Sequence, residues 1–370
     1  MIDQRLKKLC RTLVTYSMNV QKGERVLIEN FDCPEQLSEQ LIKEVYAAGG
    51  VPFCTMHSAR VQRALLMNAT RQQIEDLTRY DAAMMQEMQA YVAFRGGFNT
   101  SEMSDISDEN LFLYRSIYSK RVHHELRVQK TKWVVLRYPS GSMAQLAGKS
   151  TEQFEDFYFD VCNLDYSKMD KAMDALKRRL QNTDQVRILS PGTDITFSVK
   201  GIPSKKCSGH MNIPDGEIYT APLRDSANGR ITYNAPSFSQ GFKFENVSLL
   251  FENGRIIEAT ANNTERLNKI LDTDEGARCL GEFAFGVNPH IKDPMCDTLF
   301  DEKISGSIHL TPGSCYEDAY NGNESAVHWD LVLIQRPEYG GGEIWFDGQL
   351  VRKDGRFLGE LGILNEENLI

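Results

Sequence analysis

The pattern of apolar and polar positions changes character near the middle of the chain. In the first half, short apolar runs alternate with stretches whose apolar residues recur every three to four positions, which predicts strands separated by helices. Strands are predicted at 25–29, 51–56, 91–95 and 133–137. Helices are predicted at 3–19, 34–48, 59–68, 71–89 and, as two stretches, 107–128. Because strands joined through helices pair in parallel by right-handed crossovers, this half predicts a mostly parallel sheet with flanking helices.

After two further helices within 151–181, the chain becomes a series of short strands with turns between them. Strands are predicted at 186–189, 195–199, 217–220, 230–233 and 244–259, and a helix at 264–272. Tight hairpin turns are predicted at Asn253-Gly254, Asp347-Gly348 and Asp354-Gly355. We therefore expect an N-terminal α/β domain at 1–185. A C-terminal α+β domain at 186–370, rich in antiparallel strands, is expected to follow it.

Composition narrows the class of protein without identifying a substrate. A length of 370 residues favours two domains, and 41% apolar with 25% charged residues is ordinary for a soluble protein. The net charge of −9 argues against nucleic acid and anionic membranes as partners. The N-terminus lacks the apolar core of a signal peptide, and the eight cysteines are scattered without a C-x-x-C pair. These features predict reduced thiols and a cytoplasmic location.

The stretch 302–330 carries the most suggestive chemistry in the chain. His309 lies in an alternating run, 304–310, that predicts a strand, and His328 and Asp330 begin a second apolar run. Side chains two residues apart in a strand point to the same face, so this imidazole and carboxylate should project together. Such nitrogen and oxygen donors suit zinc, cobalt or manganese. The spacing alone also allows a buried core histidine or a hydrogen-bonded His–Asp dyad.

Two glutamates upstream have a similar context. Glu217 follows a turn that contains Pro214 and Gly216, which would hold its carboxylate at the mouth of a strand. Glu282 is flanked by apolar residues and glycines, so it is either an edge-strand charge or a buried, paired group. Cys315 neighbours the candidate stretch, but no base is dedicated to it, and we interpret it as a packing residue.

Four ordered blocks resemble one known family, and two flanking blocks, at 20–30 and 190–201, extend the likeness over nearly the whole chain. The blocks are NIPDGEIYTAP at 212–222, LGEFAFGVNP at 280–289, DEKISGSIHLTPGSCY at 301–316 and HWD at 328–330. They resemble the thermophilic-type aminopeptidases, which are dinuclear metallopeptidases of the aminopeptidase T, aminopeptidase S and PepS type.

The resemblance implies a fold, an activity and a metal site. The family's ligand pattern falls on Glu217, Glu282, His309, His328 and Asp330. It implies two divalent ions, zinc, cobalt or manganese, bridged by Glu282 and by a hydroxide that attacks the scissile carbonyl. The substrate would be a peptide with a free N-terminus. The resemblance also implies a homodimer.

Two further residues match catalytic positions of the family, and each role has an alternative. Glu302 either carries a proton from water to the leaving amine, or it orients His309 or pairs with Lys303. Tyr316 either donates a hydrogen bond to the tetrahedral oxyanion or is a buried aromatic packing residue. The segment between Tyr316 and His328 is short for the family, and Thr311-Pro312 replaces smaller or apolar residues. We therefore expect the substrate pocket to differ from that of the relatives.

Two other classes of function compete with the peptidase. Ring-cleaving dioxygenases that act on dihydroxypyridines resemble the same family and use a single ferrous ion. The presence of both Glu217 and Glu282 favours the dinuclear hydrolase. The third class is a non-catalytic protein that has kept the scaffold. The metal content separates the first two, since the peptidase requires two ions per chain and the dioxygenase one.

Overall fold

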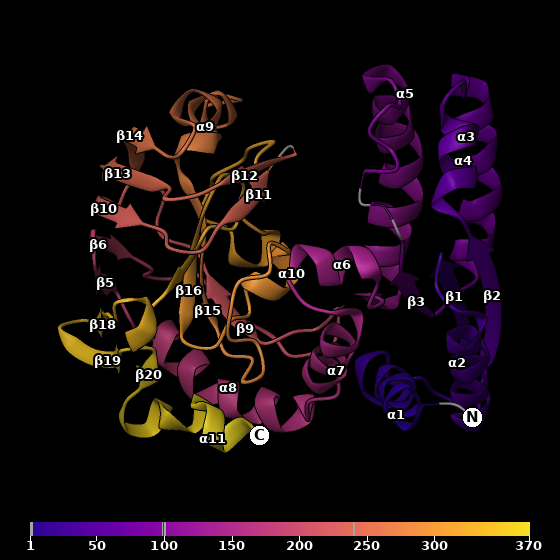
Figure 1. The fold of residues 1–370 in the computed structure, drawn as a ribbon, viewed down its shortest axis with the longest axis horizontal. Coiled ribbons are helices and arrows are strands. Elements are labelled where there is room, and N and C mark those ends of the chain that lie inside the picture. The colour runs from indigo at the N-terminus through magenta and orange to yellow at the C-terminus, as the bar shows by residue number, and fades with distance from the viewer. Residues whose placement is uncertain (1–2, 98, 100, 240) are drawn as a thin grey trace. The chain divides into compact units, whose positions relative to one another are not determined.

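The computed structural model describes residues 3–97, 99, 101–239 and 241–370, and within them the chain forms two compact units (Figure 1). The first comprises Met1–Asn163 with Gly209–Pro214, and the second Leu164–Ser208 with Asp215–Ile370. The predicted fold class, mixed α/β with a parallel sheet first and antiparallel sheets afterwards, is confirmed. The domain boundary near residue 185 stays a prediction, because compactness does not measure independent folding. No described helix is long and apolar enough to cross a lipid bilayer.

The first unit is built on one parallel sheet with the strand order β2-β1-β3-β4-β8. Its strands are β1 (Arg25–Phe31), β2 (Val51–His57), β3 (Ala90–Arg95), β4 (Lys132–Arg137) and β8 (Asn212–Ile213). The four predicted strands are therefore confirmed, and they pair in parallel as expected. The sequence did not predict β8, which joins β4 from far along the chain. Two residues are too few to show an alternating pattern.

Apolar side chains of these strands are buried on both faces of the parallel sheet. Leu27, Tyr91 and Ala93 pack against a cluster that includes Ile74 and Val122 from the helical segments. The α-helices of this unit are α1 (Gln4–Thr12), α2 (Glu35–Ala47), α3 (Ala59–Leu66), α4 (Arg71–Gln86), α5 (Asp108–Leu113), α6 (Gly141–Leu146) and α7 (Thr151–Cys162). A π-helical segment, Tyr114–Val128, extends α5 and packs on α4. Because neighbouring residues point to opposite faces, Val26, Ile28 and Val92 are buried on the other side.

The second unit contains two larger antiparallel sheets and a short ribbon. The central sheet has the order β17-β16-β15-β9-β7, from β7 (Lys205–Cys207), β9 (Glu217–Thr220), β15 (Leu280–Gly286), β16 (Ser307–Pro312) and β17 (Val332–Ile334). The outer sheet has the order β14-β13-β10-β6-β5-β18-β19-β20. Its strands are β5 (Gln185–Ser190), β6 (Thr193–Ser198), β10 (Asn228–Thr232), β13 (Ser248–Glu252), β14 (Arg255–Thr260), β18 (Glu343–Phe346), β19 (Gln349–Lys353) and β20 (Arg356–Phe357). The ribbon pairs β11 (Ser237–Ser239) with β12 (Phe242–Phe244).

The predicted hairpins of the outer sheet are confirmed by their backbone conformation. Asn253-Gly254, Asp347-Gly348 and Asp354-Gly355 each have two consecutive residues with positive φ, as a type I′ turn requires. They join β13 to β14, β18 to β19 and β19 to β20. The helices of this unit are α8 (Tyr166–Gln181), α9 (Thr264–Leu271), α10 (Thr298–Asp301) and α11 (Glu366–Leu369).

Aromatic side chains pack between the two sheets and cover one face of the central sheet. Phe283 on β15 contacts Phe197 of β6, with ring centroids 5.0 Å apart, and Phe285 contacts Phe346 of β18 at 6.1 Å. The outer sheet accordingly runs alongside β15 and β16 in Figure 1. Because side chains alternate along β15, Glu282 and Ala284 point away from this core. The opposite face of the central sheet is therefore where polar side chains can gather.

Candidate metal centre

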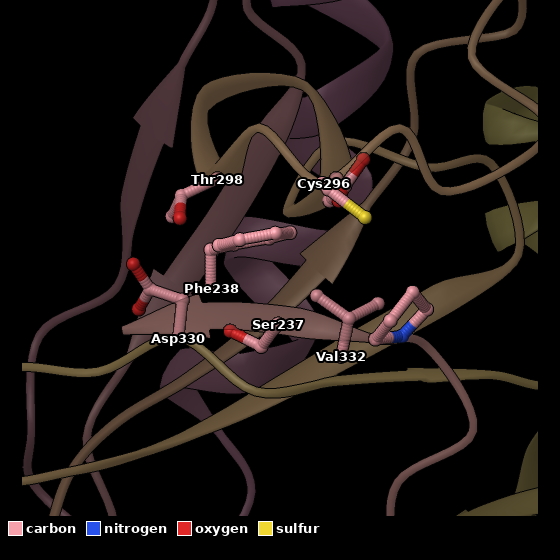
Figure 2. Close-up of a pocket in the computed structure, with 8 residues that line it drawn as sticks. Ser237, Phe238, Cys296, Thr298, Asp330 and Val332 are labelled. Atoms are coloured by element: carbon pink, nitrogen blue, oxygen red, sulfur yellow. The ribbon is translucent and has the colours of Figure 1, made fainter. Parts of the chain in front are cut away.

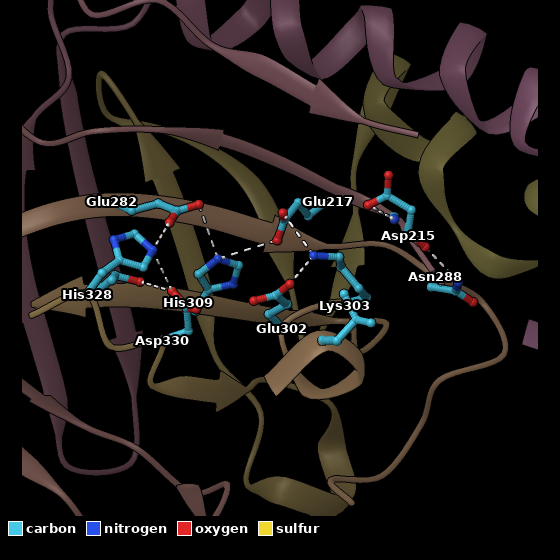
Figure 3. A network of polar contacts seen from close by, with 12 residues as sticks. Asp215, Glu217, Glu282, Asn288, Glu302, Lys303, His309, His328 and Asp330 are labelled. Atoms are coloured by element: carbon cyan, nitrogen blue, oxygen red, sulfur yellow. Dashed lines mark hydrogen bonds and ion pairs between the residues drawn. The ribbon is translucent and has the colours of Figure 1, made fainter. Parts of the chain in front are cut away.

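The register of the central sheet brings three of the predicted ligands to that face (Figure 3). Ala284 lies opposite His309 on β16, and Gly286 lies opposite Glu217 on β9. Directly opposed residues of antiparallel strands point to the same side, and Glu282 shares that side with Ala284. Glu217, Glu282 and His309 therefore converge, although 92 residues separate the first from the last.

The connection into β17 supplies the remaining pair. Gly313 and His328 form an isolated antiparallel β-bridge. Two features require glycine at position 313: its φ is +109°, and a Cβ there would lie 2.0 Å from the carbonyl oxygen of Val327. Nδ1–H of His328 donates to the carbonyl of Ser314 at 2.7 Å, which leaves Nε2 facing the other ligands. Asp330 accepts a hydrogen bond of 2.7 Å from the hydroxyl of Thr311. Nε2 of His328 lies 3.4 Å from Oδ1 of Asp330, so the two side chains project together as predicted, although both residues precede β17 and are not part of a strand.

Glu282 stands at the centre of the arrangement. Its Oε1 lies 3.4 Å from Nε2 of His309, and its Oε2 lies 3.3 Å from Nε2 of His328. Two donor groups result, namely Glu217 with Glu282 and His309, and Glu282 with His328 and Asp330. Within each group the donor atoms lie within 4.8 Å of one another, and Glu282 belongs to both groups.

Several of these donors are buried without the hydrogen bonds that burial normally requires. Among the described residues, Oε2 of Glu217 and Nε2 of His328 make no hydrogen bond, although they lie 3.5 Å from Nε2 of His309 and 3.3 Å from Oε2 of Glu282. Glu282 is only 2% exposed. Burying charged and polar atoms in this way is costly unless they are paired or coordinate a metal. The donor set therefore fits divalent cations better than a core hydrogen-bond network.

The electrostatics of the cluster point the same way. Burial disfavours the charged imidazole, but Glu282 outweighs it and raises the pKa of His309 to about 9. The pKa of His328 is raised to about 11, because Asp330 and Glu282 outweigh its burial. Burial opposes the charge of Asp330, yet His328 holds the pKa of that carboxyl well below its usual range. Cation binding must displace the histidine protons, so metal affinity falls with falling pH.

Glu302 lies beside the first donor group. It follows α10, and one of its oxygens contacts Nζ of Lys303. The same Nζ lies 2.9 Å from Oε1 of Glu217. Burial raises the pKa of Glu302 well above its usual range, against the effect of Lys303. The pairing with Lys303 is thus observed, and a role for Glu302 in proton transfer stays a prediction.

Tyr316 lies at the edge of the same site. Its ring centroid is 4.8 Å from that of His328 and 5.2 Å from that of Tyr219. The residue is 46% exposed, which argues against a buried packing role. Burial of its hydroxyl and the nearby carboxylates, Glu282 first among them, raise the pKa of Tyr316, so the phenol keeps its proton. It can therefore act as a hydrogen-bond donor.

The sequence did not single out several residues that shape the site. Cys207 and Asp215 form a further potential ligand group with Glu217. Asp215 lies two residues before Glu217, so its position was a usable signal, but the isolated Cys207 gave none. Asn288 donates to the backbone carbonyl of Asp215 at 2.8 Å and so helps to fix the turn before Glu217. Cys315 donates to the carbonyl of Asn323 at 3.2 Å, in keeping with a packing residue.

A small cavity adjoins the second donor group (Figure 2). Asp330 and the side chains of Phe238 and Thr298 line it, together with the buried Asp301. Burial raises the pKa of Asp301 to about 7, although the backbone N–H of Met295 donates to its carboxylate at 2.7 Å. The folded chain therefore holds this proton more tightly than the unfolded chain does.

Asp301 is expected to make the stability of the chain depend on pH. Its contribution to folding is present below the unfolded pKa near 3.8 and is lost as the pH rises through about 7. The gap between the two values corresponds to at most ~4 kcal/mol. The melting temperature of Asp301→Asn, relative to the wild type, should therefore rise from pH 5 to pH 8. Thermal unfolding of the metal-free proteins measures this, with Asp225→Asn at an exposed site as the control. A difference that stays constant with pH would contradict the assignment.

Comparison with known proteins places the chain among metallopeptidases. The family model described as thermophilic metalloprotease (M29) matches residues 2–355. Aminopeptidase PepS of Streptococcus thermophilus is 26% identical over an alignment that covers 89% of this chain and 92% of PepS.

Two solved structures share the fold. AmpT from Thermus thermophilus superposes with a TM-score of 0.77 at 21% identity, covering 96% of this chain and 99% of AmpT. The 2,5-dihydroxypyridine dioxygenase of Pseudomonas putida KT2440 superposes with a TM-score of 0.61 at 11% identity, covering 98% and 99%. At these identities the two structures bear on the fold alone.

Proposed function

Because the chain belongs to the thermophilic metalloprotease (M29) family and is a metallo-aminopeptidase, we propose that it removes N-terminal residues from peptides with two divalent ions. One ion would be held by Glu217, Glu282 and His309, and the other by Glu282, His328 and Asp330. The nitrogen and oxygen donors suit zinc, cobalt or manganese. We also propose the cytoplasmic location that the sequence predicts and the homodimer that the family resemblance implies.

One observation carries this proposal, namely that Glu282 is shared between the two donor groups. Its two oxygens face two different histidines, at 3.4 and 3.3 Å. A carboxylate with this placement suits a bridge between two ions, because each oxygen meets a separate set of donors. A single-metal site would use only one of the two groups, whereas two ions would use both.

The ions would supply Lewis acidity to the scissile carbonyl and make a water molecule acidic enough to act as the nucleophile. The chain's own groups then handle protons and charge. Glu302, next to the first donor group, would accept the proton of the water and deliver it to the leaving amine. The hydroxyl of Tyr316, which keeps its proton, would donate to the oxyanion as the carbonyl becomes tetrahedral. Carboxylates on this face would also receive the free α-amine, which explains the need for an unblocked N-terminus.

Chelation tests the proposal. Treatment with a strong divalent chelator should abolish hydrolysis of an aminoacyl chromogenic amide, and cobalt, zinc or manganese should restore it. An N-acetylated version of the same substrate should stay uncleaved throughout. Activity that survives exhaustive chelation would contradict a metal-dependent reaction.

The dioxygenase alternative has weaker support. The likeness to the dihydroxypyridine enzyme is one of fold, at 11% identity. Both donor groups are complete here, whereas a mononuclear iron centre needs three protein ligands and open positions for oxygen and substrate. We therefore do not propose oxygenase activity for this chain.

A further inference from the structure

Lys303 is an unusual residue for the interior of a protein. It is 1% exposed, and its Nζ lies between two carboxylates of the candidate site (Figure 3). It is 2.9 Å from Oε1 of Glu217 and in contact with Oε1 of Glu302. A buried ammonium costs several kcal/mol unless it is paired and hydrogen-bonded. Both partners of Lys303 belong to the site rather than to the surrounding fold.

The backbone of Lys303 is held on both sides, so the position of its ammonium is well defined. Its N–H donates to the carbonyl of Phe300 at 3.0 Å, which closes the turn after α10. Its carbonyl accepts from the N–H of Asn288 at 3.0 Å, which ties it to the end of β15. These two backbone hydrogen bonds hold Lys303 in place between α10 and β16, and its side chain extends from there to the site.

The contact with Lys303 makes the two carboxylate oxygens of Glu217 unequal. Oε1 is occupied by the ammonium. Oε2 is buried, has no hydrogen-bond partner among the described residues, and lies 3.5 Å from Nε2 of His309. A carboxylate can bind a cation through one oxygen or through both. Because the ammonium engages Oε1, Oε2 is the oxygen better placed to bind a cation beside His309.

We propose that Lys303 is a positioning residue that limits Glu217 to one metal-ligating oxygen and holds Glu302 beside the same donor group. This inference rests on the proposed function, because it presupposes cations bound at the site. The simpler alternative is an ion pair that stabilises the fold and leaves the metal environment unaffected. The two differ in what happens to the bound metal when the charge of Lys303 is removed.

The test compares Lys303→Met, which keeps the length but removes the charge, with Lys303→Arg, which keeps the charge. Lys206→Met is the matched control, because the ammonium of Lys206 in the same unit pairs with Asp170 and Asp174 rather than with a proposed ligand. The metal-free proteins are loaded with Co²⁺, and its visible absorption spectrum, its affinity in competition with a chelator, and kcat are measured.

Lys303→Met should change the Co²⁺ spectrum, since Glu217 becomes free to bind through both oxygens, and should lower metal affinity or kcat by about 10- to 100-fold. Lys303→Arg should restore the spectrum toward that of the wild type, and Lys206→Met should leave it unchanged. If circular dichroism shows that Lys303→Met is unfolded, Lys303→Gln, which also lacks the ammonium and is shorter by one bond, is expected to show the same changes.

A wild-type spectrum, affinity and kcat in the folded, uncharged variant would overturn the inference and leave an ion pair that serves the fold. That result is separable from failure of the proposed function. The latter would appear in the wild-type protein itself, as the absence of a second Co²⁺ or of aminopeptidase activity.

Discussion

Glu282→Gln is expected to lose bound metal and aminopeptidase activity together. Glutamine keeps the shape of the side chain but replaces one carboxylate oxygen with a neutral NH₂ group that cannot ligate. Because each oxygen of Glu282 faces a different donor group, the change should weaken both ions at once. Loss of Lewis-acid stabilisation worth ~4 kcal/mol corresponds to a fall in kcat/KM of about 1,000-fold.

Metal analysis after gel filtration and hydrolysis of an aminoacyl chromogenic amide measure the two effects in the same sample. Glu258→Gln is the matched control, since Glu258 lies exposed on β14 of the same unit and pairs with Arg230. It should keep full metal content and activity. Retention of two ions by Glu282→Gln would contradict the proposal that Glu282 binds both of them.

Tyr316→Phe is expected to keep both metals and lose turnover. The phenol lies beside His328 and keeps its proton, so it can donate to the developing oxyanion without acting as a ligand. Removal of one oxyanion donor lowers kcat by about 100- to 1,000-fold. KM should change little, because the hydrogen bond strengthens only as the carbonyl becomes tetrahedral.

Steady-state kinetics with metal analysis separate this outcome from a structural defect. Tyr320→Phe serves as the control, because Tyr320 is exposed in the same loop and its hydroxyl contacts Glu324. Unchanged kcat in the Tyr316 variant would reduce Tyr316 to a packing role at the edge of the site.

The strong local patterns of the chain predicted most of the fold. Buried parallel strands such as β1 and β3 are continuous apolar runs between helices, and the Asn-Gly and Asp-Gly pairs require turns with positive φ. β8 was missed because its placement depends on pairing with β4 rather than on its own two residues. The chain segments before and after Gly209–Pro214, which contains β8, belong to the other unit, so the local sequence pattern does not predict that β8 joins the parallel sheet.

The candidate site was predictable in part. The side chains of His328 and Asp330 meet as the sequence predicts, but they do so in the segment before β17 rather than within a strand. Nothing local indicates that Glu217 and Glu282 lie on one face with His309, since this follows from the register of three strands, and only the family resemblance joined them. The sequence indicates Lys303 only as a partner of its neighbour Glu302, because the contact with Glu217 depends on the fold.

The short segment between Tyr316 and His328 has a structural explanation. Nδ2 of Asn323 donates to the carbonyls of Gly313 and Gly276, at 2.6 and 2.9 Å, and Asn321 donates to the carbonyl of Leu280 at 2.8 Å. The bond to Leu280 anchors the segment to the start of β15. A difference between this substrate pocket and that of the relatives stays a prediction.

The number of metal ions bound per chain at full activity distinguishes a two-metal site from a one-metal site. The metal-free protein is titrated with Zn²⁺, Co²⁺ or Mn²⁺, and bound metal is counted by mass spectrometry while aminopeptidase activity is followed in the same samples. We expect activity to be complete when two ions are bound per chain. Full aminopeptidase activity with one ion, or a protein that binds only a single iron, would contradict it.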